Sequence, residues 1–168
     1  MAWLLAGCAG LAPMAQAAVN TALEAKVMAA YVFHMIKFVE WPALPEDGFR
    51  ICVHDDDAVS TLLSELANRT VRDRPLRIET DGDLARCQVL FLGRGEKSLG
   101  DILPKTRRQG VLTVSAQSDF ARKGGIVGFY MDAGKLRLEV NPEAAKAANL
   151  RMSAKLLELS RTVPPGRE

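Results

Sequence analysis

Residues 87–92 read CQVLFL, and the fold class can be predicted from this segment. Its almost continuous apolar run is typical of a strand that is buried on both faces, as the strands of a parallel sheet are. Helices must then cover both faces of the sheet, so we expect helices to alternate with strands before and after this stretch.

The rest of the chain shows this alternation. The other predicted strands are Phe49–His54, Leu76–Glu79, Val111–Val114, Ile126–Met131 and Leu136–Val140. The predicted helices are Thr21–Val39, Ala58–Ala67, Ser98–Leu103, Glu143–Ala148 and Ser153–Ser160. The pattern predicts an α/β fold, a three-layer αβα domain with a mixed sheet of about six strands. Asp132-Ala133-Gly134 between the last two strands predicts a C-terminal antiparallel hairpin.

Local signals predict where several helices begin or end. Asp57 is the expected N-cap of the helix Ala58–Ala67, and Asn141 is the expected N-cap of the helix that follows Pro142. Pro104 is expected to stop the helix Ser98–Leu103, because proline has no N–H group to donate.

Composition and charge limit the class of protein. The chain has 168 residues, of which 48% are hydrophobic and 25% charged, which is typical of one globular domain. The net charge is +2, which argues against a protein that binds nucleic acid by charge alone. No uncharged apolar stretch reaches the length of about 18 residues that a transmembrane helix needs.

The N-terminus has the pattern of an export signal. Residues 1–17 carry no charged side chain, and the apolar run Ala2–Ala12 is followed by Ala15-Gln16-Ala17, an A-x-A cleavage pattern. Cleavage between Ala17 and Ala18 would leave a single domain, residues 18–168, of 168 − 17 = 151 residues. Alternatively, Leu5-Ala6-Gly7-Cys8 is a bacterial lipobox, and Cys8 is lipidated. Both interpretations predict an exported domain.

The remaining cysteines are Cys52 and Cys87. Two cysteines in an exported domain predict one disulfide, and the alternative is a pair of buried free thiols. Such a bond would stabilise the fold by about 3–4 kcal/mol, because it restricts the unfolded chain.

The sequence shows no catalytic apparatus. His54-Asp55-Asp56-Asp57 at a strand end could hold Mg²⁺, but the strand 87–92 ends in Leu92-Gly93-Arg94 without the carboxylate that a receiver domain needs. We therefore interpret the acidic run as a solvated turn and helix cap. Gly93-Arg94-Gly95 lacks the third glycine of a dinucleotide-binding loop.

Metal and covalent chemistry also lack their motifs. His34 and His54 have no ligand-like partner, so we expect no metal site and no cofactor. No G-x-S-x-G nucleophile motif is present. The basic pairs Arg107-Arg108 and Arg122-Lys123 are interpreted as solvated surface.

The first predicted helix carries more apolar side chains than one buried stripe requires. Val27, Tyr31, Met35 and Phe38 recur at helical spacing, and Trp41-Pro42 ends the pattern. We predict that this helix supplies a surface for self-association or partner binding. The alternative is a helix that its own domain buries on most sides. The candidate interaction residues are Tyr31, His34, Phe38 and Trp41.

Several segments together resemble one known family. They are VMAAYVFHMIKFVEWP (27–42), FRICV (49–53), RPL (74–76), CQVLFL (87–92), VLTVSAQSDFARKGGIVGFYMDAGKLRLEV (111–140) and LRMSAKLL (150–157). In order and spacing they resemble the YfiR family of periplasmic proteins. The sequence departs from the family at His34, where a small polar residue is expected, and in having one cysteine pair where the best-known member has two.

The resemblance implies a non-enzymatic regulator in the periplasm. Such a protein binds the periplasmic part of an inner-membrane diguanylate cyclase and represses it, so that it controls cyclic-di-GMP and biofilm formation. The implied further partner is an outer-membrane lipoprotein of the YfiB type, which relieves the repression. Self-association through the first helix predicts a homodimer as well. The alternatives are a periplasmic small-molecule sensor or binding module and, from a third class, a small exported enzyme.

Overall fold

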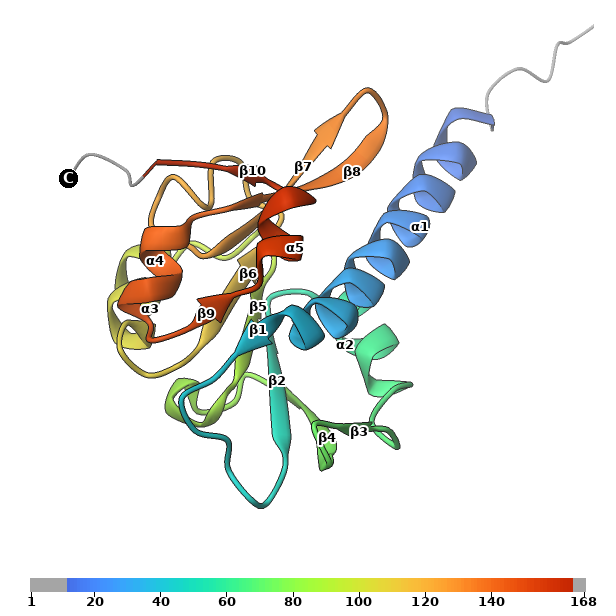
Figure 1. Ribbon diagram of the computed structural model, residues 1–168. Helices are drawn as coiled ribbons and strands as arrows, with labels where there is room; N and C mark the ends of the chain where they lie inside the picture. Colours follow the sequence, from blue (N-terminus) through green and yellow to red (C-terminus); the bar gives the residue numbers. More distant parts are fainter. Residues whose placement is uncertain (1–11, 165–168) are drawn as a thin grey trace, which may run out of the picture.

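The computed structural model describes residues 12–164 as a mixed α/β domain (Figure 1). The predicted lipobox at Cys8 lies outside the described residues. The predicted cleavage site between Ala17 and Ala18 falls within the first helix, α1 (Ala12–Met35), and remains a prediction. Within residues 12–164, no helix is both long and apolar enough to cross a membrane.

One sheet of eight strands forms the centre of the molecule. In spatial order its strands are β10 (Arg161–Thr162), β8 (Lys135–Val140), β7 (Val127–Asp132), β6 (Leu112–Ser115), β5 (Val89–Leu92), β2 (Phe49–His54), β4 (Arg74–Thr80) and β3 (Thr70–Val71). The central strands β4, β2, β5, β6 and β7 pair in parallel, and β7 and β8 form the antiparallel hairpin. A separate two-stranded sheet pairs β1 (Val39–Glu40) with β9 (Arg151–Met152).

The helices pack on the two faces of the large sheet. Besides α1 they are α2 (Asp57–Ser64), α3 (Leu99–Thr106), α4 (Pro142–Ala147) and α5 (Ala154–Glu158), with short 3-10 helices η1 (Ile36–Phe38) and η2 (Leu84–Arg86). The predicted α/β class is confirmed. The sheet has eight strands rather than about six, because it also contains β3 and β10, two-residue strands too short to show a pattern in the sequence.

Alternation along the strands divides the core into two unequal parts. In β2, Ile51 and Val53 belong to the larger cluster, and Cys52 between them points to the smaller one. The larger cluster also receives apolar side chains from α1, α2, α4 and α5, so we call this side of the sheet the helical face. The smaller cluster takes Ile102 and Leu103 from α3, and we call its side the disulfide face.

The disulfide predicted from the two cysteines is present. Cys52 in β2 and Cys87, which follows η2, are bonded, with their Cα atoms 5.8 Å apart. Both are buried, beside Leu90 and the fully buried Phe120. The bond therefore joins β2 to the segment that leads into β5.

Three predicted helix ends need correction. Asp56, not Asp57, is the N-cap of α2, because its Oδ1 accepts a hydrogen bond from the Val59 N–H at 2.9 Å. Pro104 lies inside α3 instead of ending it, since the helix continues to Thr106. The first helix ends at Met35 and not at Val39. The 3-10 helix η1 follows it, and Val39 already belongs to β1, where it pairs with Met152 of β9.

The predicted cap at Asn141 is confirmed. Its Oδ1 accepts a hydrogen bond from the Ala144 N–H at 2.9 Å, and Pro142 occupies the first position of α4. The turn of the hairpin is confirmed as well, with Ala133 and Gly134 both at positive φ, as a two-residue connection of this kind requires.

Candidate functional site

Three of the four predicted interaction residues line one groove. Tyr31 and His34 on α1 and Phe38 in η1 face side chains of β8 and α5 across a hollow of about 220 Å³. We call it the α1–α5 groove. It is lined by Tyr31, His34, Met35, Phe38, Arg137, Leu138, Leu156 and Leu159.

The floor of the groove is buried and its rim is exposed. Met35, Leu138 and Leu156 belong to the core of the helical face. Above them, Leu159 is 68% exposed and Tyr31 is 38% exposed. Complete burial of an apolar side chain of this size in an interface stabilises the complex by about 1.5–3 kcal/mol.

The walls of the groove are held by contacts outside it. The Ser153 N–H donates to the Phe38 carbonyl at 2.9 Å, and Val39 pairs with Met152, so the start of α5 is fixed against the end of η1. The Tyr31 ring packs edge-on against Phe129 of β7, with centroids 5.9 Å apart. These contacts fix α1, η1 and α5 relative to one another and to the sheet.

Basic side chains lie in and beside the groove. Arg137 on β8 and His34 on α1 are exposed members of the lining. The Lys155 Nζ lies 5.8 Å from the centre of the Phe38 ring, which is cation–π distance. A partner segment that presents an apolar side chain with an acidic residue nearby would be complementary to this groove.

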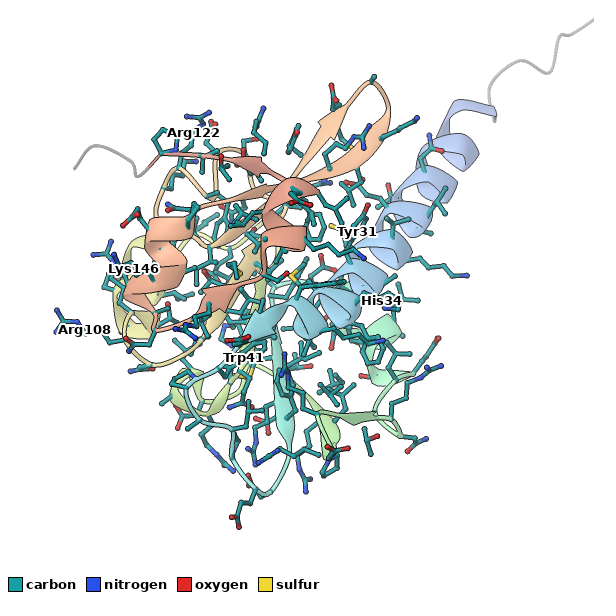
Figure 2. All side chains as sticks on the ribbon, viewed as in Figure 1. Tyr31, His34, Trp41, Arg108, Arg122 and Lys146 are labelled. Atoms are coloured by element: carbon teal, nitrogen blue, oxygen red, sulfur yellow. A yellow bond between two sulfur atoms is a disulfide. The ribbon has the colours of Figure 1, made fainter. Side chains whose placement is uncertain are left out.

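Trp41 does not join this group. Its ring packs edge-on against Phe49 at 5.1 Å, and its Nε1 donates to the Gln88 carbonyl at 3.3 Å. Arg72 lies 5.7 Å from the same ring. Figure 2 shows Trp41 beyond the end of the helix, apart from Tyr31 and His34. The sequence analysis predicts Trp41 as a fourth interaction residue, but the structure places it outside the groove, in packing contacts with Phe49 and Gln88.

Beyond the groove, α1 and the hairpin carry two further exposed apolar side chains. Leu23 on α1 is 60% exposed, and Met131 on β7 is 55% exposed. Figure 1 shows the N-terminal half of α1 rising beside the β7–β8 hairpin. The predicted apolar surplus of the first helix is therefore only partly buried by the domain, although Val32 and Met35 are core residues.

The acidic strand end forms a different kind of surface. Asp55, Asp57, Asp81 and Glu96 line a hollow of about 460 Å³ beside the ends of β2 and β4. The Ser98 N–H donates to Glu96 at 2.7 Å, and this bond lowers the pKa of Glu96. Among residues 12–164, no cluster of three or more His, Cys, Asp or Glu side chains is arranged to hold a metal ion.

Comparison with known proteins identifies a family. Residues 25–161 match the family described as YfiR/HmsC-like. No curated protein matches the sequence. The matched range runs from the middle of α1 into β10 and contains every residue that lines the α1–α5 groove.

Proposed function

The chain belongs to the YfiR/HmsC-like family, and on this basis we propose that it is a periplasmic regulator of cyclic-di-GMP signalling that binds and represses an inner-membrane diguanylate cyclase. The family match carries the proposal. In this role the protein does not catalyse a reaction. It binds one conformation of its partner better than another, and so shifts the population of the cyclase towards the inactive state.

We place the cyclase contact at the α1–α5 groove. The groove combines a buried floor with the exposed apolar side chains Tyr31 and Leu159. Exposed aromatic and apolar residues over a preformed hollow are typical of the energetic centre of a protein interface. A shift of the cyclase from 1:99 to 99:1 requires about 5.5 kcal/mol of preference between its two states. An interface of about 800 Å² per partner is large enough for that.

The size of the groove favours a protein segment over a small molecule. At about 220 Å³ it is smaller than the sites of about 300–1,000 Å³ that usually enclose a ligand. One or two partner side chains would fill it. A second copy of the chain, in a homodimer, and an outer-membrane lipoprotein of the YfiB type that releases the cyclase are the other partners in this proposal.

The proposal is tested in cells by deleting the gene. Cellular cyclic-di-GMP should rise in the deletion strain and return to its initial level when the wild-type gene is restored. A strain that lacks both this gene and the cyclase separates this effect from others, because there the deletion should change nothing. Unchanged cyclic-di-GMP in the single deletion, with the cyclase shown to be expressed, would contradict the proposal.

A further inference from the structure

The fold brings together basic side chains that are far apart in the sequence. They come from the end of α3, from the loop between β6 and β7, and from α4. All are exposed. We call them the basic flank: Lys105, Arg107, Arg108, Arg122, Lys123 and Lys146.

Hydrogen bonds hold the three segments against one another. The Arg108 N–H donates to the carbonyl of Ala147 at 3.1 Å, which fixes the end of α3 beside the end of α4. The Asn141 Nδ2 donates to the carbonyl of Ala121 at 2.8 Å, which fixes the β6–β7 loop beside the start of α4. The basic flank is therefore one feature of the folded protein, although the sequence shows only separate short pairs.

The flank has an excess of positive charge. Its six cations share these segments with three acidic residues, Asp101, Asp119 and Glu143, so its net charge is 6 − 3 = +3. The whole chain carries +2, which leaves 2 − 3 = −1 for everything else. Within residues 12–164, the only ion pair that involves a flank cation joins Arg122 to Asp119 at 3.9 Å. Most of the flank cations thus remain available to an external anion.

The cations are spread over one side of the molecule. In Figure 2, Arg108 and Lys146 point outward from the same side, and Arg122 stands at its upper end. Because they do not converge, a small anion could contact only one or two of them. An extended anionic surface could contact several at once.

We propose that the basic flank docks the protein on the anionic phospholipid headgroups of the inner membrane. This inference rests on the proposed function, which places the protein beside a partner in that membrane. Tyr31 in the groove and the labelled cations of the flank lie on different sides of the molecule (Figure 2), so docking leaves the groove free for the cyclase. Each Lys or Arg near such a surface strengthens binding by about five-fold, and the effect is screened by salt.

The test is vesicle co-sedimentation of the purified exported protein. Vesicles of phosphatidylcholine are compared with vesicles in which one third of the lipid is phosphatidylglycerol. The test variant is Arg107→Gln/Arg108→Gln/Lys146→Gln, whose three side chains make no ion pair in residues 12–164. The control is Lys26→Gln/Lys97→Gln/Lys135→Gln, which removes the same charge from exposed positions elsewhere.

We expect the wild type and the control to bind the anionic vesicles and the test variant to bind about 100-fold more weakly. Binding should also fall as salt is raised. No binding to anionic vesicles at low salt would overturn the proposal, and so would an equal loss in both variants. Binding of the flank to an acidic part of the cyclase, without vesicle binding, would overturn it too. Each of these outcomes is compatible with repression of the cyclase. Failure of the membrane-docking proposal is therefore distinguishable from failure of the proposed function.

Discussion

The two faces of the eight-stranded sheet achieve burial in different ways. The helical face is covered by four helices, and its strands contribute mainly apolar side chains such as Ile51, Phe91 and Val114. The disulfide face has one short α-helix, α3, and besides the disulfide it buries polar groups such as Arg50 on β2 and Glu139 on β8. The disulfide face thus depends on the disulfide and on polar contacts, whereas the helices of the helical face keep some apolar side chains exposed, where a partner could bind.

The largest expected effect is the loss of an aromatic anchor on the disulfide face. Phe120 is fully buried, and it packs so closely on Gly125 that a Cβ there would lie 2.2 Å from the ring. Phe120→Ala should lower the free energy of unfolding by about 3–5 kcal/mol, measured by chemical denaturation. Tyr31→Ala on the helical face, where the ring is part-exposed, should cost much less. Equal losses of stability in the two variants would contradict the proposed difference between the two faces.

Removal of the disulfide should have the next largest effect. The bond spans 35 residues, so Cys52→Ala/Cys87→Ala should lose about 3–4 kcal/mol of stability. Reduction of the wild type should lower the free energy of unfolding by a similar amount, and the denaturation midpoint should fall accordingly. In cells, Cys52→Ser should weaken repression because less folded protein is present. A midpoint that reduction leaves unchanged would show that the disulfide face does not depend on this bond.

An ion pair at the edge of the disulfide face should matter less. The Arg161 Nη2 donates to the Glu139 carboxylate at 2.6 Å, and the Glu139 side chain is 4% exposed, whereas Arg161 is about half exposed. Arg161→Ala leaves a buried carboxylate without this partner and should cost about 2 kcal/mol. The double variant Arg161→Ala/Glu139→Gln should recover part of the lost stability, because the second substitution removes the buried charge. The rescue would fail if Arg161 acted only through its contact with the Tyr130 ring.

The corrected helix cap on the helical face gives the smallest effect. Asp56→Ala removes the hydrogen bond to the Val59 N–H and should cost about 1 kcal/mol. Asp57→Ala is the matched control, since Asp57 only contributes charge in the first turn, worth about 0.3–1 kcal/mol at low salt. Thermal denaturation at moderate salt should separate the two variants. The reverse order would restore Asp57 as the cap.

The elements that the sequence predicted best are those with a strong local pattern. The strand Phe49–His54 was predicted with its observed bounds, because its apolar run ends at an acidic turn. The pairs β1–β9 and β8–β10 were missed, because two-residue strands have no periodicity and form only when distant segments meet. Pro104 was misjudged because the buried side chains of Ile102 and Leu103 hold α3 in place beyond it.

The candidate site was only partly predictable for the same reason. The apolar surplus of the first predicted helix pointed to Tyr31, His34 and Phe38, and the structure brings these three together. Leu159 and Arg137, on the opposite walls, lie in segments whose patterns carry no sign of the groove. The basic flank likewise depends on contacts between α3, α4 and a loop, so the sequence showed only solvated pairs.

The most direct test of the account is the affinity of two matched variants for the purified periplasmic part of the cyclase. Leu159→Gln changes the rim of the groove, and Leu23→Gln changes a similarly exposed leucine of α1 outside it. Both should alter folding stability by no more than about 0.5 kcal/mol. Calorimetry should show about ten-fold weaker binding for Leu159→Gln and wild-type binding for Leu23→Gln, because only Leu159 becomes buried in the complex. Wild-type affinity in Leu159→Gln would contradict the assignment of the α1–α5 groove as the docking surface.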